Sequence, residues 1–106
     1  MTARRPTSPG EVLREEFLTP CEITQEELAE AMGVSRFRVN EIVNGKRAIT
    51  AETAILLSKA LGTSAKLWMN LQMAVDLFDA KEKLAGAADA VRCLLPATDF
   101  VTEVPA

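Results

Sequence analysis

The chain has 106 residues, of which 48% are hydrophobic and only 5% aromatic, and its formal net charge at pH 7 is −3. This length fits one domain with a hydrophobic core, and long runs without Gly or Pro favour an all-α fold over a β-sandwich. Histidine, the commonest general base and metal ligand, is absent. Cys21 and Cys93 have no CxxC spacing and no neighbouring ligands. We therefore expect two reduced thiols, no enzyme activity, no metal site, no cofactor and no small-molecule substrate.

The sequence also lacks signals for a membrane. No run approaches the roughly 18 apolar residues of a membrane span, and the basic N-terminal residues are not followed by the apolar stretch of a signal peptide. We therefore expect a cytoplasmic protein without membrane contact.

Charge is distributed unevenly along the chain. Residues 11–30 hold seven carboxylates and one arginine, whereas residues 36–47 hold four cations and one glutamate. This pattern predicts one acidic and one basic face, so a protein of negative net charge can still present cations to phosphate. The pair Arg4 and Arg5 belongs either to a solvated tail or to an arm that touches phosphate.

Capping residues predict the first helix. Ser8 is placed as N-cap, Pro9 at the first helical position and Glu11 as the second partner of a capping box. The sequence Thr19-Pro20 ends the helix, because the residue before proline is pushed out of the α region. Its apolar stripe consists of Val12, Leu13, Phe17 and Leu18.

Two short helix patterns then meet at Gly33, within residues 24–50. The first begins with a capping box formed by Thr24 and Glu27, and it ends at Gly33, which adopts a left-handed conformation without strain. The second begins at Ser35 as N-cap. The inward positions are Leu28, Ala29, Met32, Val34, Val39, Ile42 and Val43. This combination predicts a helix-turn-helix, whose second helix enters the DNA major groove.

The second of these helices carries the candidates for base contact. Arg36 and Arg38 lie in its first turn, where a guanidinium can bond guanine O6 and N7. Asn40 can bond adenine or reach a phosphate instead. Phe37 is either exposed, and then able to contact a thymine methyl, or partly buried near the turn. Glu41 is expected to pair with a nearby arginine.

Candidates for phosphate contact flank that helix. Gln25 combines an amide donor with a helix N-terminus. Asn44, Lys46 and Arg47 follow the second helix and suit the phosphates beside the groove, with a solvated turn as the alternative for the last two.

Two further helices are expected. Thr50 caps one over residues 51–61 that ends at Gly62, and Ser64 caps a longer one that reaches about residue 85. The longer helix is apolar on more than one side, which requires more than one packing partner. We expect a two-fold homodimer through it. The predicted dimer contacts are Trp68, Leu71, Val75 and Phe78, beside a further apolar stripe of Met69, Met73 and Leu77.

The C-terminal part has a weaker pattern. We assign residues 1–85 to the helix-turn-helix domain and residues 86–106 to an extension of open structure. Residues 87–95 could form a short helix, and residues 97–106 could be a loose or β-pairing tail.

Three blocks carry a resemblance to a known family. SPGEVLREEFL, QEELAEAMGVSRFRVNEIVNGKRAIT and AETAILLSKALGTSAKLWMNLQMAVDL together resemble the HigA/VapI-type antitoxin branch of the Cro/lambda-repressor-like helix-turn-helix family. The resemblance runs from about Ser8 to about Leu84. The chain departs from it at Cys21-Glu22, where similar sequences more often have a turn containing glycine.

The resemblance implies a five-helix, lambda-repressor-like domain. It also implies a homodimeric antitoxin that binds an inverted repeat in its own promoter and pairs with a HigB toxin, a small RelE-like ribonuclease. The positions that match the family's DNA-facing residues are Gln25, Arg36, Arg38, Asn40, Asn44, Lys46 and Arg47.

Two other functions remain open at this point. The protein could be a stand-alone transcriptional regulator without a toxin, or a module for protein–protein interaction in which the basic loop is incidental. The acidic segment 11–30 could meet a basic toxin, or it could be a solvated helix surface.

Overall fold

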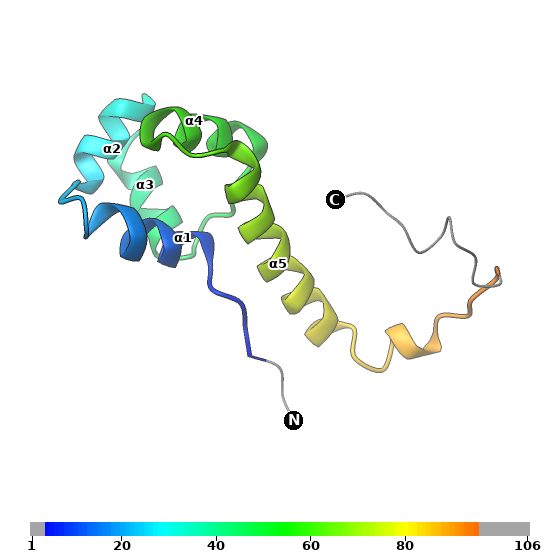
Figure 1. Ribbon diagram of the computed structural model, residues 1–106. Helices are drawn as coiled ribbons and strands as arrows, with labels where there is room; N and C mark the ends of the chain where they lie inside the picture. Colours follow the sequence, from blue (N-terminus) through cyan, green and yellow to red (C-terminus); the bar gives the residue numbers. More distant parts are fainter. Residues whose placement is uncertain (1–3, 96–106) are drawn as a thin grey trace.

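The computed structural model describes residues 4–95. This part of the chain contains five α-helices and no strand (Figure 1). The helical segments are α1 (Pro9–Val12), the π-helix η1 (Leu13–Leu18), α2 (Gln25–Met32), α3 (Arg36–Val43), α4 (Ala51–Leu61), α5 (Ala65–Lys83) and the 3₁₀ turn η2 (Ala88–Ala90). The prediction of an all-α, five-helix domain is confirmed. No helix within residues 4–95 is long and apolar enough to cross a bilayer.

Hydroxyl side chains cap every α-helix at the predicted residue. Each hydroxyl accepts a hydrogen bond from the backbone N–H three positions further on, which satisfies one of the free donors of the first turn. The capping residues are Ser8, Thr24, Ser35, Thr50 and Ser64. Glu11 and Glu27 complete the two capping boxes. Gly33 and Gly62 end α2 and α4 in the left-handed conformation, with φ of 74° and 71°.

The first helix differs from the expected regular α-helix in its second half. After Val12 it continues as η1, in which the Thr19 N–H bonds the carbonyl of Arg14, five residues back, at 3.0 Å. This wider turn places residues five apart on one side of the helix. Leu13 and Leu18 are accordingly both buried, at 0% and 5% exposure.

The hydrophobic core lies where α1–η1, α2, α3 and α4 meet the first half of α5. It consists of Leu13, Leu18, Leu28, Ala29, Met32, Val39, Ile42, Val43, Ile49, Ala54, Leu57 and Trp68. Helix α2 packs on α3, and α4 packs on α5. All inward positions predicted for α2 and α3 are buried or packed against this core.

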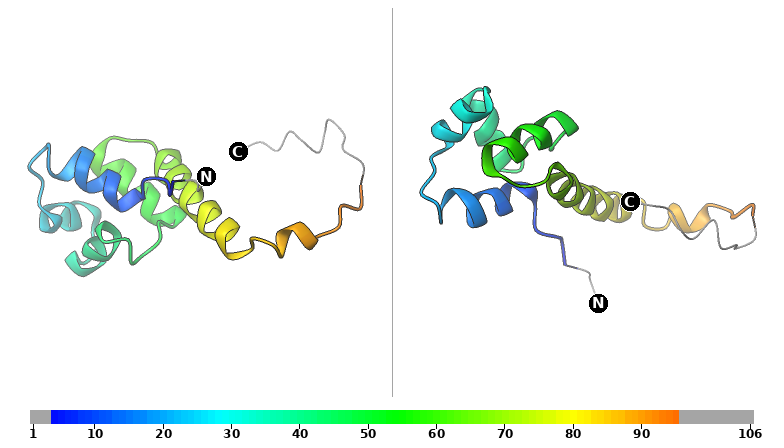
Figure 2. Two further views of the ribbon diagram at one scale, coloured as in Figure 1. Left: turned by 90° about the horizontal axis from the view of Figure 1, so that it is seen from below. Right: turned by 45° about the horizontal axis from the view of Figure 1, so that its top comes forward.

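Helix α5 supplies the largest buried side chain and then leaves the bundle. Trp68 is fully buried, donates from Nε1 to Thr63 Oγ1 at 2.7 Å, and its ring centroid lies 5.6 Å from that of Phe17. The second half of α5 projects away from α1–α4 in every view (Figures 1 and 2).

The predicted dimer contacts must therefore be corrected. Trp68 and Val75 are 0% and 5% exposed within a single chain, so they stabilise the monomer and leave no surface for a second copy. Leu71 and Phe78 are partly exposed. The periodicity of α5 shows several apolar stripes but does not say which of them the bundle covers.

The N-terminal end of the described chain lies beside α5, and the C-terminal end continues from that helix. Arg5 forms an ion pair with Asp79 on α5, with Nε–Oδ1 at 3.1 Å and Nη2–Oδ2 at 3.0 Å, a contact that the sequence did not indicate. Beyond α5, the proposed short helix over residues 87–95 is reduced to the single turn η2. The proposed tail over residues 97–106 lies outside the described residues.

Candidate nucleic-acid interface

The turn between α2 and α3 is closed by backbone hydrogen bonds. Gly33 donates to the carbonyl of Glu30 at 3.2 Å, and Val34 donates to the carbonyl of Ala29 at 3.0 Å. These bonds satisfy the last carbonyls of α2, and the left-handed Gly33 makes them possible. Val34 then packs against the core, which fixes the direction in which α3 leaves the turn.

Helix α3 has one buried face and one free face. Val39, Ile42 and Val43 are at most 5% exposed and hold the helix to the core. On the other side Arg36 is exposed, and Phe37 is 68% exposed. Of the two alternatives for Phe37, the exposed one is confirmed. The first turn of α3 therefore presents an exposed guanidinium and an exposed aromatic ring to a partner.

Arg38 lies off the buried face of α3, as the helical period predicted, but its side chain is held by the protein. It is half-buried, and its Nη2 donates to Thr53 Oγ1 on α4 at 2.8 Å. Its Nε is buried and has no hydrogen-bond partner among residues 4–95. A contact of Arg38 with a base stays a prediction, and the structure adds that α4 orients this side chain.

A chain of amide hydrogen bonds joins α2 to α3. Asn40 Nδ2 donates to Gln25 Oε1 at 3.1 Å, and Asn44 Nδ2 donates to Asn40 Oδ1 at 3.2 Å. The oxygen of Gln25 is thus used internally, which leaves its NH₂ group as a donor at the N-terminus of α2. Three of the predicted contact residues therefore form one hydrogen-bonded row.

The loop after α3 carries the remaining predicted cations. Gly45 turns the chain with φ of 71°. Arg47 pairs with Glu41 through Nε and Nη2, both on Oε1, at 2.9 and 2.8 Å. This pair confirms the expected role of Glu41. Lys46 is exposed and makes no ion pair within residues 4–95.

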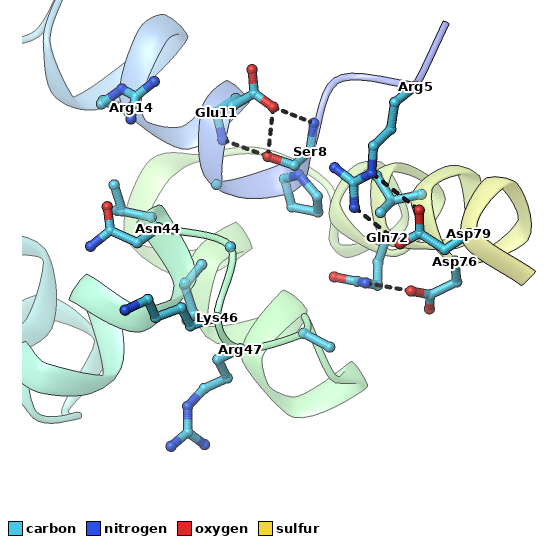
Figure 3. Close-up of a pocket in the computed structure, with 17 residues that line it drawn as sticks. Arg5, Ser8, Glu11, Arg14, Asn44, Lys46, Arg47, Gln72, Asp76 and Asp79 are labelled. Carbon is cyan, nitrogen blue, oxygen red and sulfur yellow. Dashed lines mark hydrogen bonds and ion pairs between the residues drawn. The ribbon is translucent and has the colours of Figure 1, made fainter. Parts of the chain in front are cut away.

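A polar cleft of about 500 Å³ lies behind this loop, between α1, the loop and α5 (Figure 3). The Arg5–Asp79 pair lies on its α5 side, where Gln72 also donates to Asp76 at 2.8 Å. The side chains of Lys46 and Arg47 point away from the Arg5–Asp79 pair. The cleft thus separates the cations after α3 from the carboxylates of α5.

Hydrogen bonds hold the loop and the start of α1 on either side of this cleft. Gln72 Oε1 accepts the backbone N–H of Ile49 at 2.8 Å, which ties the end of the loop to α5. The N–H and hydroxyl of Ser8 bond the carboxylate of Glu11, and the backbone bond is the main reason that the pKa of Glu11 is lowered. In the same way, the hydrogen bond from Arg5 lowers the pKa of Asp79.

Sequence reasoning missed two residues that shape this surface. Thr53 lies three positions after the N-cap of α4, and its position indicated only a helix start. Gln72 lies in the middle of α5 and showed no motif. Both bond residues more than ten positions away in the sequence, and no local pattern reports such a pairing.

Comparison with known proteins gives a consistent result. A helix-turn-helix family model matches residues 13–68. Antitoxin HigA-1 of Vibrio cholerae is 47% identical over 93 residues, which cover 88% of each chain. The structure of Pseudomonas aeruginosa antitoxin HigA with the higBA promoter has a TM-score of 0.80 and 41% identity, and covers 86% of this chain and 100% of that chain. A second Pseudomonas aeruginosa structure, solved with 18-bp operator DNA, has a TM-score of 0.81 and 40% identity, and covers 89% of this chain and 100% of that chain.

Proposed function

Because this chain belongs to the HigA-type antitoxin branch of the helix-turn-helix family, we propose that it is a DNA-binding antitoxin that represses its own promoter. The exposed first turn of α3 carries the proposal. It presents Arg36 without an ion-pair partner within residues 4–95, on a helix whose other face is locked into the core. Two similar structures contain promoter or operator DNA, which supports this role for α3.

Within this function some of these side chains contact bases and the others contact phosphates. Arg36 and Arg38 read guanine, Asn40 reads adenine, and the exposed ring of Phe37 contacts a thymine methyl. The amide of Gln25 binds phosphate at the N-terminus of α2. Asn44, Lys46 and Arg47 bind the phosphates beside the groove. Asn40, the proposed base contact, is hydrogen-bonded to Gln25 and Asn44, the proposed phosphate contacts. This row of amides therefore links base contact to phosphate contact.

We infer that the protein acts as a two-fold dimer on a palindromic operator, because one reading helix covers only one half-site. The best surface for the second copy is the apolar stripe that the bundle leaves uncovered on α5. Met69, Met73 and Leu77 are 37%, 45% and 52% exposed and line an apolar groove. The partly exposed Leu71 and Phe78 lie on the same helix.

The second partner is a HigB-type toxin, which the family resemblance describes as a RelE-like ribonuclease. The carboxylates of α1–η1 and α2 are exposed and suit a basic toxin surface: Glu11, Glu15, Glu16, Glu26, Glu27 and Glu30. Neutralisation of the toxin is a binding function, so the chain itself needs no catalytic residues.

Residues 1–85 form the DNA-binding unit in this proposal, and residues 86–106 form an extension beyond it. Because operator DNA lies in the cytoplasm, the proposed function is a cytoplasmic one.

DNA binding can be tested by fluorescence anisotropy with the duplex directly upstream of the gene and with a shuffled duplex. We expect tighter binding to the upstream duplex, and an affinity that falls linearly with salt on logarithmic axes. Arg36→Ala should lose about 1–3 kcal/mol of discrimination at one base pair. Lys46→Ala should weaken binding to both duplexes alike and reduce the salt slope by about one.

Equal affinity for the two duplexes would contradict the proposed function. Equal losses on both duplexes after Arg36→Ala would remove only the assignment of Arg36 as a base reader. The toxin partner is tested by co-purification with the product of an adjacent, short and basic reading frame. Its absence would favour the stand-alone regulator.

A further inference from the structure

One buried hydroxyl lies directly behind the reading helix. Thr53 is 1% exposed and is the only buried polar or charged residue within residues 4–95. Its Oγ1 accepts Nη2 of Arg38 at 2.8 Å and lies 3.1 Å from Oγ1 of Thr50. A buried hydroxyl hydrogen is costly to leave unbonded. The contact of Thr53 with Thr50 is a second hydrogen bond, in which either hydroxyl can be the donor.

The same contact fixes one edge of the Arg38 guanidinium. Nε and Nη2 share an edge, and this edge faces the protein, because Nε is buried and Nη2 bonds Thr53. The Nη1–Nη2 edge remains, and its three other N–H groups make no hydrogen bond within the part of the chain that the structure describes. Two parallel N–H groups on one edge are what guanine O6 and N7 require. Without the hydrogen bond to Thr53, Arg38 could present either edge to DNA, and its side chain would lose more rotamer freedom on binding.

We propose that Thr53 is a positioning residue for base recognition, which holds Arg38 so that its Nη1–Nη2 edge is presented to a guanine. Thr53 itself does not touch DNA. This inference rests on the proposed function and extends it, since a side chain of α4 then sets part of the specificity of α3. The residues that determine which operator sequence is bound would then include one outside the helix-turn-helix.

Two substitutions at Thr53 separate positioning from packing. Thr53→Val keeps the β-branched shape and removes the acceptor, whereas Thr53→Ser keeps the hydroxyl and removes the methyl group. Both are compared with wild type on the upstream duplex and on all its single-base-pair variants, which gives a discrimination profile. Arg38→Ala and Arg36→Ala provide the two reference profiles.

We expect Thr53→Val to lose about fivefold in discrimination, the worth of one net hydrogen bond, at the positions that Arg38→Ala affects. Positions affected by Arg36→Ala should keep their wild-type discrimination, and Thr53→Ser should retain the wild-type profile. A uniform loss over all positions, an unchanged profile for Thr53→Val, or equal losses in both Thr53 variants would overturn the proposal.

A measurement on the DNA-free protein distinguishes the contact from the proposed function. Slowed rotation of the bonded guanidinium should give separate Nη signals for Arg38 in ¹⁵N NMR spectra at low temperature, retained in Thr53→Ser and averaged in Thr53→Val. Averaged signals in wild type would overturn the proposal. If wild type instead shows separate signals but no preference for its upstream DNA, the proposed function fails and the role in base reading fails with it, while the hydrogen bond stands.

Discussion

Gly10 offers the sharpest test of how α1 supports the reading helix. It is buried in α1, and its backbone lies against the end of α3. A Cβ added at Gly10 would overlap the carbonyl oxygen of Ile42 and lie 2.6 Å from that of Val43. Both atoms belong to the backbone, so no side-chain rotation can relieve the clash. Gly10→Ala therefore requires α1 to move away from α3.

The size of the effect follows from two opposing contributions. Overpacking of this kind costs roughly 1–3 kcal/mol, while alanine gains at most about 1 kcal/mol over glycine from helix propensity. Because rigid backbone groups must separate, we expect a net destabilisation of about 2 kcal/mol. For a domain of this size each kcal/mol lowers Tm by about 4–8 °C. Thermal unfolding followed by circular dichroism should thus show a fall of about 8–16 °C.

A control separates this clash from the general effect of replacing a glycine. Gly62 has open space around its Cα and a φ of 71°, a conformation that asparagine tolerates. Gly62→Asn should therefore change the free energy of unfolding by less than about 1 kcal/mol. If Gly10→Ala melts at or above the wild-type temperature, the close approach of α1 to α3 is wrong.

Three further predictions concern strain, assembly and pH. Glu22 has a left-handed φ of 54°, so Glu22→Gly should raise the free energy of unfolding by up to about 1 kcal/mol, measured by urea denaturation; a lower midpoint would exclude strain at this turn. Met73→Glu places a charge in the exposed stripe of α5 and should convert a dimer to a monomer in analytical ultracentrifugation, whereas an unchanged mass would exclude this stripe as the interface. The backbone N–H of Thr24 lowers the pKa of Glu27 below the ordinary value of a glutamate. The stabilisation from this bond is therefore complete above the ordinary pKa and is lost as the pH falls through the lowered one. Glu27→Gln should therefore flatten the loss of stability in acid, and an identical acid profile would contradict this assignment.

The local features of the fold were predictable because they depend on neighbouring residues. Each N-cap hydroxyl bonds a backbone N–H three positions away, so the helix starts at Thr24, Ser35 and Thr50 could be read from the sequence. Gly33 ends α2 for an equally local reason, its left-handed φ. The departure at Cys21-Glu22 was also visible, and the structure gives its physical consequence, a left-handed residue that is not glycine.

Helical period did not decide which apolar stripe of α5 is covered. Trp68 and Met69 are adjacent and both apolar, yet the first is fully buried and the second is 37% exposed. Only the angle at which α5 meets the bundle makes this difference. The predicted dimer surface was wrong at Trp68 and Val75 for this reason.

The sequence by itself determined the helix-turn-helix, its caps and the side chains that α3 can present, since these depend on contacts within a few residues along the chain. The tertiary structure alone decided how those side chains are held. Arg38 bonds Thr53 across 15 positions, and Asn40 bonds Gln25 across the same separation. Such bonds form only after the core has brought α2 and α4 against α3, because hydrogen-bond geometry depends on the relative placement of whole helices.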